Sequence, residues 1–246
     1  MNYSLGNMLS CGRRVAFNPL SLSPALWLSD TGSNSAQWDD LSGNGRHATQ
    51  AIGANQPAIV TGALNGRQVR RFDGVNDTIG RTNTPLIGNI AGYTIFHVYS
   101  YRSLPNVNLG AFGIRYTGAA TVFLDSKVAA SSSYRTGYRR LTGDAFSFFD
   151  LGVAATGFSI KCHVMNFVGG VGQMLLNGSS LGTAAIPSGN TADVINDFWV
   201  GVNASGLSDF APIDSAEILV FPTALSTENR RRIEGYLSSK YNIPLA

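Results

Sequence analysis

The three histidines are the first side chains to consider for metal or acid–base chemistry. They are His47, His97 and His163, and they lie far apart in the sequence. Zinc sites are often signalled by short spacings such as HxH or HExxH, which place two histidines within a few residues of each other. Neither spacing occurs here. We therefore predict no zinc site and interpret each histidine as a surface or sheet-face residue.

Carboxylates are the second candidates for chemistry, and they are few. The glutamates are Glu217, Glu228 and Glu234, and none belongs to a Glu-rich strand. Retaining glycosidases typically need two carboxyl groups about 5 Å apart. Aspartate pairs could in principle act instead, but turn formation is the commoner role for Asp beside Gly and Asn. These pairs are Asp73 with Asp77 and Asp193 with Asp197. We therefore predict that the chain has no catalytic residues and is not an enzyme.

One strand pattern carries the side chains most suited to binding a ligand. The stretch from Tyr93 to Tyr101 alternates, so that Phe96 and Val98 share one face of the strand. The opposite face carries the candidate ligand-binding residues Tyr93, His97, Tyr99 and Tyr101. Sugar rings stack on aromatic faces with polar tips. Packing between two sheets would explain the same row, and alternation alone does not decide which face meets water.

Strand patterns fill most of the chain, and a single helix pattern follows them. Residues 216–221 are apolar and β-favouring and end at Pro222. Ser226 then offers a helix N-cap, and apolar residues recur at helical spacing up to Tyr241. We interpret the charged side chains from Arg230 to Lys240, Glu234 included, as the solvated face of this helix.

Many short strands with one helix predict an antiparallel β-sandwich or barrel. We expect one core between two sheets. Its predicted members are Phe72, Phe96, Val98, Phe158, Ile160, Val164, Leu219 and Phe221.

Composition fits one large domain and gives little support for several classes of partner. Hydrophobic residues make up 44% of the 246 residues and charged residues 13%. The net charge of +3 is spread along the chain, which is weak evidence for nucleic acid. No apolar run is long enough for a membrane helix, and the N-terminus lacks a secretory signal pattern. We therefore expect no membrane or nucleic-acid partner, and we interpret both cysteines as free thiols.

The first 21 residues form a predicted N-terminal arm, and residues 22–246 form the predicted domain. The arm shows no sustained hydrophobic period, and its isolated apolar residues are too few for a core. We expect it to attach the domain to another subunit or protein. The candidate attachment residues are Leu5, Met8, Leu9, Arg13, Arg14 and Phe17.

Four motifs, taken in order, resemble the concanavalin A-like lectin/glucanase superfamily in its laminin-G-like jelly-roll form. They are WDDLSGNG at 38–45, VRRFDGVND at 69–77, LLNG at 175–178, and the terminal strand and helix from residue 216. The resemblance spans about 22–245 and implies an all-β, antiparallel two-sheet jelly-roll sandwich with one C-terminal helix. Some members hold calcium, which makes Asp73, Asn76 and Asp77 weak calcium candidates; otherwise no cofactor is expected.

The resemblance implies function only by analogy, because one fold hosts many functions. Domains of this kind occur in bacteriophage particles and as carbohydrate-binding modules. Our leading expectation is a non-enzymatic structural or decoration protein of a virion, in capsid or tail. It would be made in the host cytoplasm and joined to other virion proteins in several copies through the arm. The alternative is a module that binds a surface glycan, and a glycoside hydrolase comes third.

Overall fold

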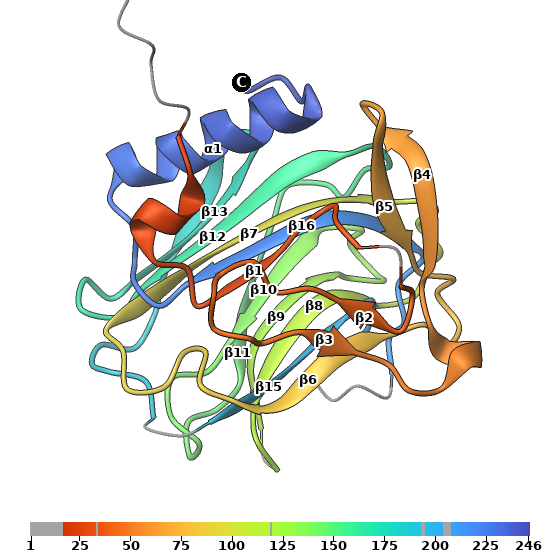
Figure 1. Cartoon of the computed structure of the whole chain (residues 1–246). Coiled ribbons are helices and arrows are strands. Elements are labelled where there is room, and N and C mark those ends of the chain that lie inside the picture. The colour runs from red at the N-terminus through yellow and green to blue at the C-terminus, as the bar shows by residue number, and fades with distance from the viewer. Residues whose placement is uncertain (1–16, 33, 119, 193–194, 204–207) are drawn as a thin grey trace, which may run out of the picture.

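Two antiparallel β-sheets face each other and form a sandwich, as the sequence predicts (Figure 1). The computed structural model describes residues 17–32, 34–118, 120–192, 195–203 and 208–246. Within these residues the only α-helix is α1 (Thr227–Tyr241), and two short 3₁₀ helices are η1 (Pro19–Leu22) and η2 (Gly53–Asn55). The all-β sandwich with one C-terminal helix is therefore confirmed.

The first sheet lies under helix α1 and has the order β14-β13-β12-β7-β16-β5-β4, with β1 also paired to β16. Its strands are β1 (Leu26–Leu28), β4 (Ala58–Leu64), β5 (Arg67–Arg71), β7 (Gly92–Tyr101), β12 (Ser159–Asn166), β13 (Val171–Leu176), β14 (Ser179–Ala185) and β16 (Ile213–Phe221). Strands β7 and β16 occupy its centre, and every residue of both is buried.

The second sheet has the order β11-β10-β9-β8-β15-β6-β3-β2. Its strands are β2 (Gln37–Trp38), β3 (Ala48–Thr49), β6 (Ile79–Thr84), β8 (Leu109–Tyr116), β9 (Thr121–Lys127), β10 (Tyr134–Tyr138), β11 (Ser147–Leu151) and β15 (Asn196–Val200). It forms the lower layer in Figure 1, away from the helix.

Helix α1 begins and ends with clear capping signals. The Ser226 side chain accepts a hydrogen bond from the Asn229 amide at 3.3 Å, which satisfies one of the free donors of the first turn. Asn242 adopts the left-handed conformation at the C-cap, with φ of 54°. Ile233, Leu237 and Tyr241 are buried against the first sheet, so the helix is docked through one face.

The apolar side chains form two clusters, and this corrects the prediction of a single core. Of the predicted core residues only Phe72 lies in the cluster between the sheets. The others belong to or pack against the cluster between the first sheet and α1, namely Phe96, Val98, Phe158, Ile160, Val164, Leu219 and Phe221. Alternation correctly placed these residues on one face, but the helix covers that face, so both sides of the sheet are buried.

The charged face of the helix also differs from the prediction. Arg230 and Glu234 are only 8% and 2% exposed, and Arg230 Nη1 lies 2.6 Å from Glu234 Oε1. Burial raises the pKa of Glu234, against the opposing effect of Arg230. The solvated face of α1 is therefore narrower than the sequence predicts. Arg231 and Arg232 are exposed on it.

Most of the predicted arm lies outside the described residues, including Leu5, Met8, Leu9, Arg13 and Arg14. Phe17 is described, and its ring packs against Tyr236 of α1. Pro19 is buried as well. Phe17 and Pro19, near the end of the predicted arm, therefore pack on the sandwich, whereas Leu20 and Ser21 are exposed.

Two further predictions concern membrane-spanning helices and the cysteines. No helix in the described ranges is long and apolar enough to cross a membrane. Cys162 is a free, buried thiol, as predicted, whereas Cys11 lies outside the described residues.

Candidate functional site: a basic aromatic groove beside helix α1

An open groove of about 750 Å³ lies along the outer face of helix α1. We call it the basic aromatic groove. Its lining residues come from the chain before η1, from the start of β5 and from the helix, and they are Phe17, Arg67, Arg231, Arg232, Gly235, Tyr236, Ser239 and Lys240. The helical members follow two rows with a spacing of four residues, so they share one face of the helix.

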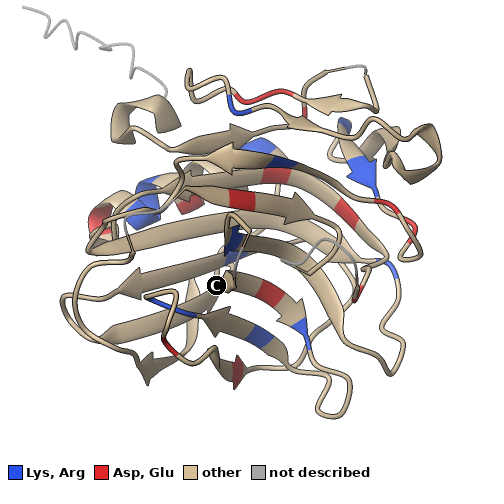
Figure 2. Cartoon of the chain, turned by 90° about the horizontal axis from the view of Figure 1, so that it is seen from below, with Lys and Arg blue, Asp and Glu red and all other residues tan. Residues whose placement is uncertain are grey.

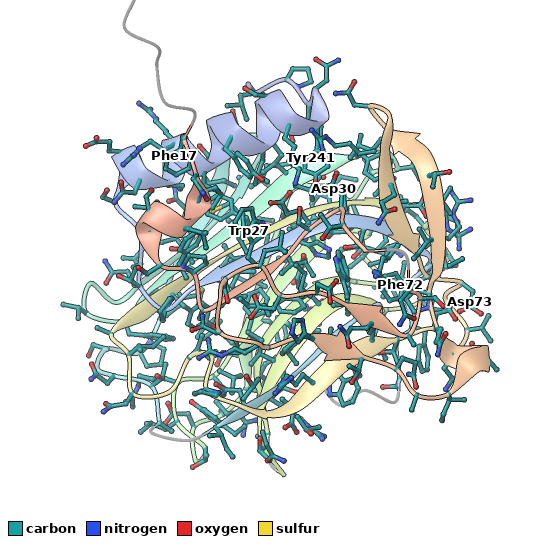
Figure 3. All side chains as sticks on the ribbon, viewed as in Figure 1. Phe17, Trp27, Asp30, Phe72, Asp73 and Tyr241 are labelled. Atoms are coloured by element: carbon teal, nitrogen blue, oxygen red, sulfur yellow. The ribbon has the colours of Figure 1, made fainter. Side chains whose placement is uncertain are left out.

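Two aromatic rings make the apolar part of the groove. The rings of Phe17 and Tyr236 have centroids 6.5 Å apart and planes at 70° to each other. Trp27 packs edge-on against Tyr236 from below, with centroids 6.3 Å apart. Figure 3 shows Phe17 beside the helix and Trp27 beneath it. Both Phe17 and Tyr236 are only partly buried, and both line the groove.

Cationic side chains surround these rings. The Arg232 guanidinium lies 4.6 Å from the centroid of the Phe17 ring, a cation–π distance. Arg67 donates from Nη1 to Asp30 Oδ2 at 2.9 Å and from Nε to the Lys240 carbonyl at 3.0 Å. These bonds fix the strand side of the groove to the end of the helix.

A buried carboxylate, Glu217 of β16, organises the base of the groove. It accepts hydrogen bonds from Trp27 Nε1 at 2.6 Å, Tyr241 OH at 2.6 Å and Tyr236 OH at 3.2 Å. Lys240 Nζ lies 2.7 Å from Glu217 Oε2 and 2.6 Å from Asp30 Oδ1. Asp30 and Tyr241 appear together at this end of the helix in Figure 3. The network holds Tyr236 and Lys240 in place.

The protonation states agree with these roles. Burial, followed by the negative charge of Glu217, raises the pKa of both Tyr236 and Tyr241, so both phenols stay protonated and donate. Burial acts to raise the pKa of Asp30, but hydrogen bonds from Lys240 and Arg67 outweigh it and the pKa is lowered. Asp30 therefore remains an anion.

The groove and its base have an excess of positive charge. Four cations, Arg67, Arg231, Arg232 and Lys240, stand against the two carboxylates Asp30 and Glu217. This leaves two positive charges in excess. Elsewhere the ribbon carries scattered charges of both signs, with most of it uncharged (Figure 2).

Gly235 lies in the middle of the helix and of the groove. A methyl group added there would meet no neighbouring atom within 4 Å, apart from the backbone of its own helix. Glycine inside a helix costs about 0.5–1 kcal/mol relative to alanine. Packing does not require this glycine, and a larger side chain at this position would extend from the lining of the groove.

The predicted ligand-binding row on β7 lies elsewhere, between the two sheets. Tyr93 and His97 are fully buried, and Tyr99 and Tyr101 are 2% and 1% exposed. These side chains therefore offer no surface on which a sugar ring could stack. The packing alternative, which the sequence left open, describes their position.

His97 and Tyr99 belong to a buried polar cluster that joins the two sheets. Asp125 of β9 pairs with Lys161 of β12, and its Oδ2 lies 3.6 Å from both His97 Nδ1 and His163 Nε2. Ser215 and Thr136 hold the other ring nitrogens at 2.8 Å. Burial lowers the pKa of both histidines. The cluster has no access to solvent, so we assign it to the stability of the sandwich.

The calcium candidates form a turn closed by its own hydrogen bonds. Asp73 Oδ1 accepts from the amides of Val75, Asn76 and Asp77 at 2.8–3.1 Å, and Asp77 Oδ2 accepts from the Asp73 amide. Within the described residues no group of three or more His, Cys, Asp or Glu side chains is arranged to hold a metal ion. Calcium binding through these oxygens and backbone carbonyls stays a prediction.

A second cleft, of about 770 Å³, lies at the rim of the sandwich. Its polar side includes Ser42, Asn44 and Arg46. Asp40 organises this loop by accepting from the Ser42 and Arg46 amides at 2.9 and 2.8 Å. The side chains that line this cleft include no aromatic ring. It is therefore less suited to stacking a sugar than the groove at the helix.

The fold and the groove define an antiparallel two-sheet β-sandwich with a cationic, aromatic surface groove. No protein-family model and no curated protein matches the sequence. Solved structures do match. The Trypanosoma rangeli sialidase in complex with sialic acid is 16% identical, with a TM-score of 0.63 over 87% of this chain and 33% of that one.

Two binding domains are also similar. The botulinum neurotoxin serotype D ligand binding domain, in complex with N-acetylneuraminic acid, is 11% identical with a TM-score of 0.64 over 87% of this chain and 51% of that one. The binding domain of Paraclostridial Mosquitocidal Protein 1 is 13% identical with a TM-score of 0.65 over 91% and 53%. The chain thus spans about a third of the sialidase and about half of these two chains.

These comparisons overturn the prediction that the chain is not an enzyme. Sialidases, which are enzymes, are among the structures that share its fold. The prediction relied on a missing glutamate pair, and sialidases are an exception to that rule because they use a tyrosine nucleophile. At 15–16% identity the likeness shows the fold alone and assigns no reaction to this chain.

Proposed function

We propose that this protein is a carbohydrate-binding β-sandwich module and that the glycan lies in the basic aromatic groove. The observation that carries the proposal is the pair of partly exposed rings, Phe17 and Tyr236, in an open groove lined by hydrogen-bond donors. Apolar ring faces stack on the C–H faces of sugars, and a few polar groups fix orientation. A volume of about 750 Å³ is in the range of ligand pockets.

The comparisons support a sugar as the ligand. Two of the similar structures were solved in complex with sialic acid or N-acetylneuraminic acid. The fold is therefore compatible with glycan recognition, although the position of the site is proposed from this chain alone. The proposal concerns binding, and the same experiments can measure turnover.

The test uses a variant that fills the groove without disturbing the core. We expect the full chain to bind members of a glycan array and Gly235→Gln to lose at least tenfold in affinity. The variant should fold at least as well as the parent, because glutamine is a better helix former than glycine. Gly143→Gln is the matched control, since Gly143 also has open space around it and lies in a loop away from the groove.

Two results would overturn the proposal. One is a folded parent chain that binds no glycan on the array. The other is a Gly235→Gln variant that binds as tightly as the parent. Thermal unfolding of each variant distinguishes a blocked groove from an unfolded protein.

The finer role in a bacteriophage particle stays a proposal from the sequence. In it the N-terminal arm attaches the module to other virion proteins, and the sandwich displays its glycan site. The packing of Phe17 on α1 bears on this role, because it places the end of the predicted arm at the groove. Mass spectrometry of purified particles would test it.

A further inference from the structure

We propose that the glycan is acidic, and that Arg231 and Arg232 bind its carboxylate while its ring stacks on Tyr236 or Phe17. The inference rests on the proposed function, because it names the class of sugar that the same groove would take. It starts from charge. Four cations and two carboxylates leave two positive charges in excess at the groove and its base.

The excess belongs to particular side chains. Lys240 has an 11% exposed side chain and lies between Asp30 and Glu217, and Arg67 pairs with Asp30. Among the groove cations in the described part of the chain, Arg231 and Arg232 form no ion pair with a carboxylate. Both are exposed. Arg232 Nη1 donates a hydrogen bond to Asn229 Oδ1 at 3.3 Å, but an incoming anion would not have to displace a carboxylate from either guanidinium group.

The chemistry of guanidinium favours a carboxylate over other ligand groups here. Arginine presents paired N–H donors that match the two oxygens of a carboxylate, and such bonds are stronger than those between neutral groups. The Arg232 guanidinium already lies over the Phe17 ring, which restricts where it can point. Gly235 leaves open space one helical turn after Arg231. A sugar ring placed there would hold its carboxylate near both arginines.

Phosphate and nucleic acid would meet the same cations, but the aromatic part of the groove favours a sugar acid. A compact phosphate needs no ring platform. A nucleic acid needs an extended basic track, whereas the net charge of +3 is spread along this chain. A sugar ring that carries one carboxylate matches both the aromatic rings and the cations of the groove.

The experiment compares ligands that differ in one charge. Titrations of the full chain with 3′-sialyllactose, its methyl ester and lactose should show binding to the acid at least tenfold tighter than to the other two. The variant R231Q/R232Q should lose this preference. The control R135Q/R139Q also removes two positive charges, one in β10 and one directly after it, and this variant should keep the preference for the acid.

The outcomes separate this inference from the proposed function. Equal binding of the acid and its ester, still lost in Gly235→Gln, would overturn the acidic sugar and leave the sugar site standing. A second result would be that inorganic phosphate or duplex DNA binds as tightly as the sialoside and that R231Q/R232Q loses this binding. That result would overturn the acidic sugar in favour of a general anion site. No binding of any sugar, with the parent folded, would overturn both.

Discussion

At the scale of single residues, Glu217 has the most contacts to explain. It is 1% exposed, and its carboxylate accepts hydrogen bonds from one lysine, two phenols and an indole. A buried carboxylate is tolerated only when paired and hydrogen-bonded, and removing one partner of such a pair is costly. Its effect on function is indirect, because it positions Tyr236 and Lys240 at the groove.

We expect Glu217→Gln to lower the free energy of unfolding by about 3 kcal/mol, since Lys240 loses one of its two carboxylate partners in a buried site. Urea unfolding at pH 7 would measure the change. Glu228→Gln is the control, because Glu228 is exposed in the first turn of the helix and should shift stability by no more than about 0.5 kcal/mol. Equal effects of the two substitutions would show that the Glu217 network contributes little.

At the scale of elements, the buried polar cluster joins strands of both sheets. Asp125 and Thr136 come from β9 and β10, whereas His97, Lys161, His163 and Ser215 come from β7, β12 and β16. Tyr99 OH also faces Asp125 and Lys161, and Lys161 Nζ lies 4.0 Å from the centroid of the Tyr134 ring. Burial lowers the pKa of both histidines, although Asp125 acts in the opposite direction.

This shift has a definite consequence for stability. A histidine whose folded pKa lies below its unfolded value of about 6.5 binds its proton more readily in the unfolded chain. Its contribution is therefore complete above pH 6.5 and is lost as pH falls toward the folded pKa. We expect the free energy of unfolding to fall below pH 6.5, by up to about 1.4 kcal/mol per pH unit for each histidine.

Urea unfolding at several pH values from 7.5 to 5 would measure this slope. His97→Gln and His163→Gln should each reduce this slope by up to about 1.4 kcal/mol per pH unit, which corresponds to one bound proton. His47→Gln is the control substitution, because His47 lies outside the cluster and its side chain is 39% exposed. A slope that persists in both cluster variants would assign the pH dependence to other groups.

At the scale of the whole molecule, the sequence predicted the fold better than the site. Strand alternation, turn residues and helix caps are local, so the sandwich and α1 could be predicted. The site depends on tertiary placement. Phe17 was assigned to an arm and Arg231 to a solvated helix face, and neither segment alone indicates that they meet at Tyr236. Alternation separates the two faces of β7 but does not show which face points between the sheets, because both faces of that strand are buried.

The position of the glycan is the central claim, and NMR shift mapping tests it most directly. The isotope-labelled full chain would be titrated with 3′-sialyllactose, and the perturbed amides would be mapped. We predict that they cluster at Phe17 and along Arg231–Lys240 of α1. Perturbations centred instead on Ser42, Asn44 and Arg46 at the rim cleft, or no perturbation at saturating sugar, would contradict the account.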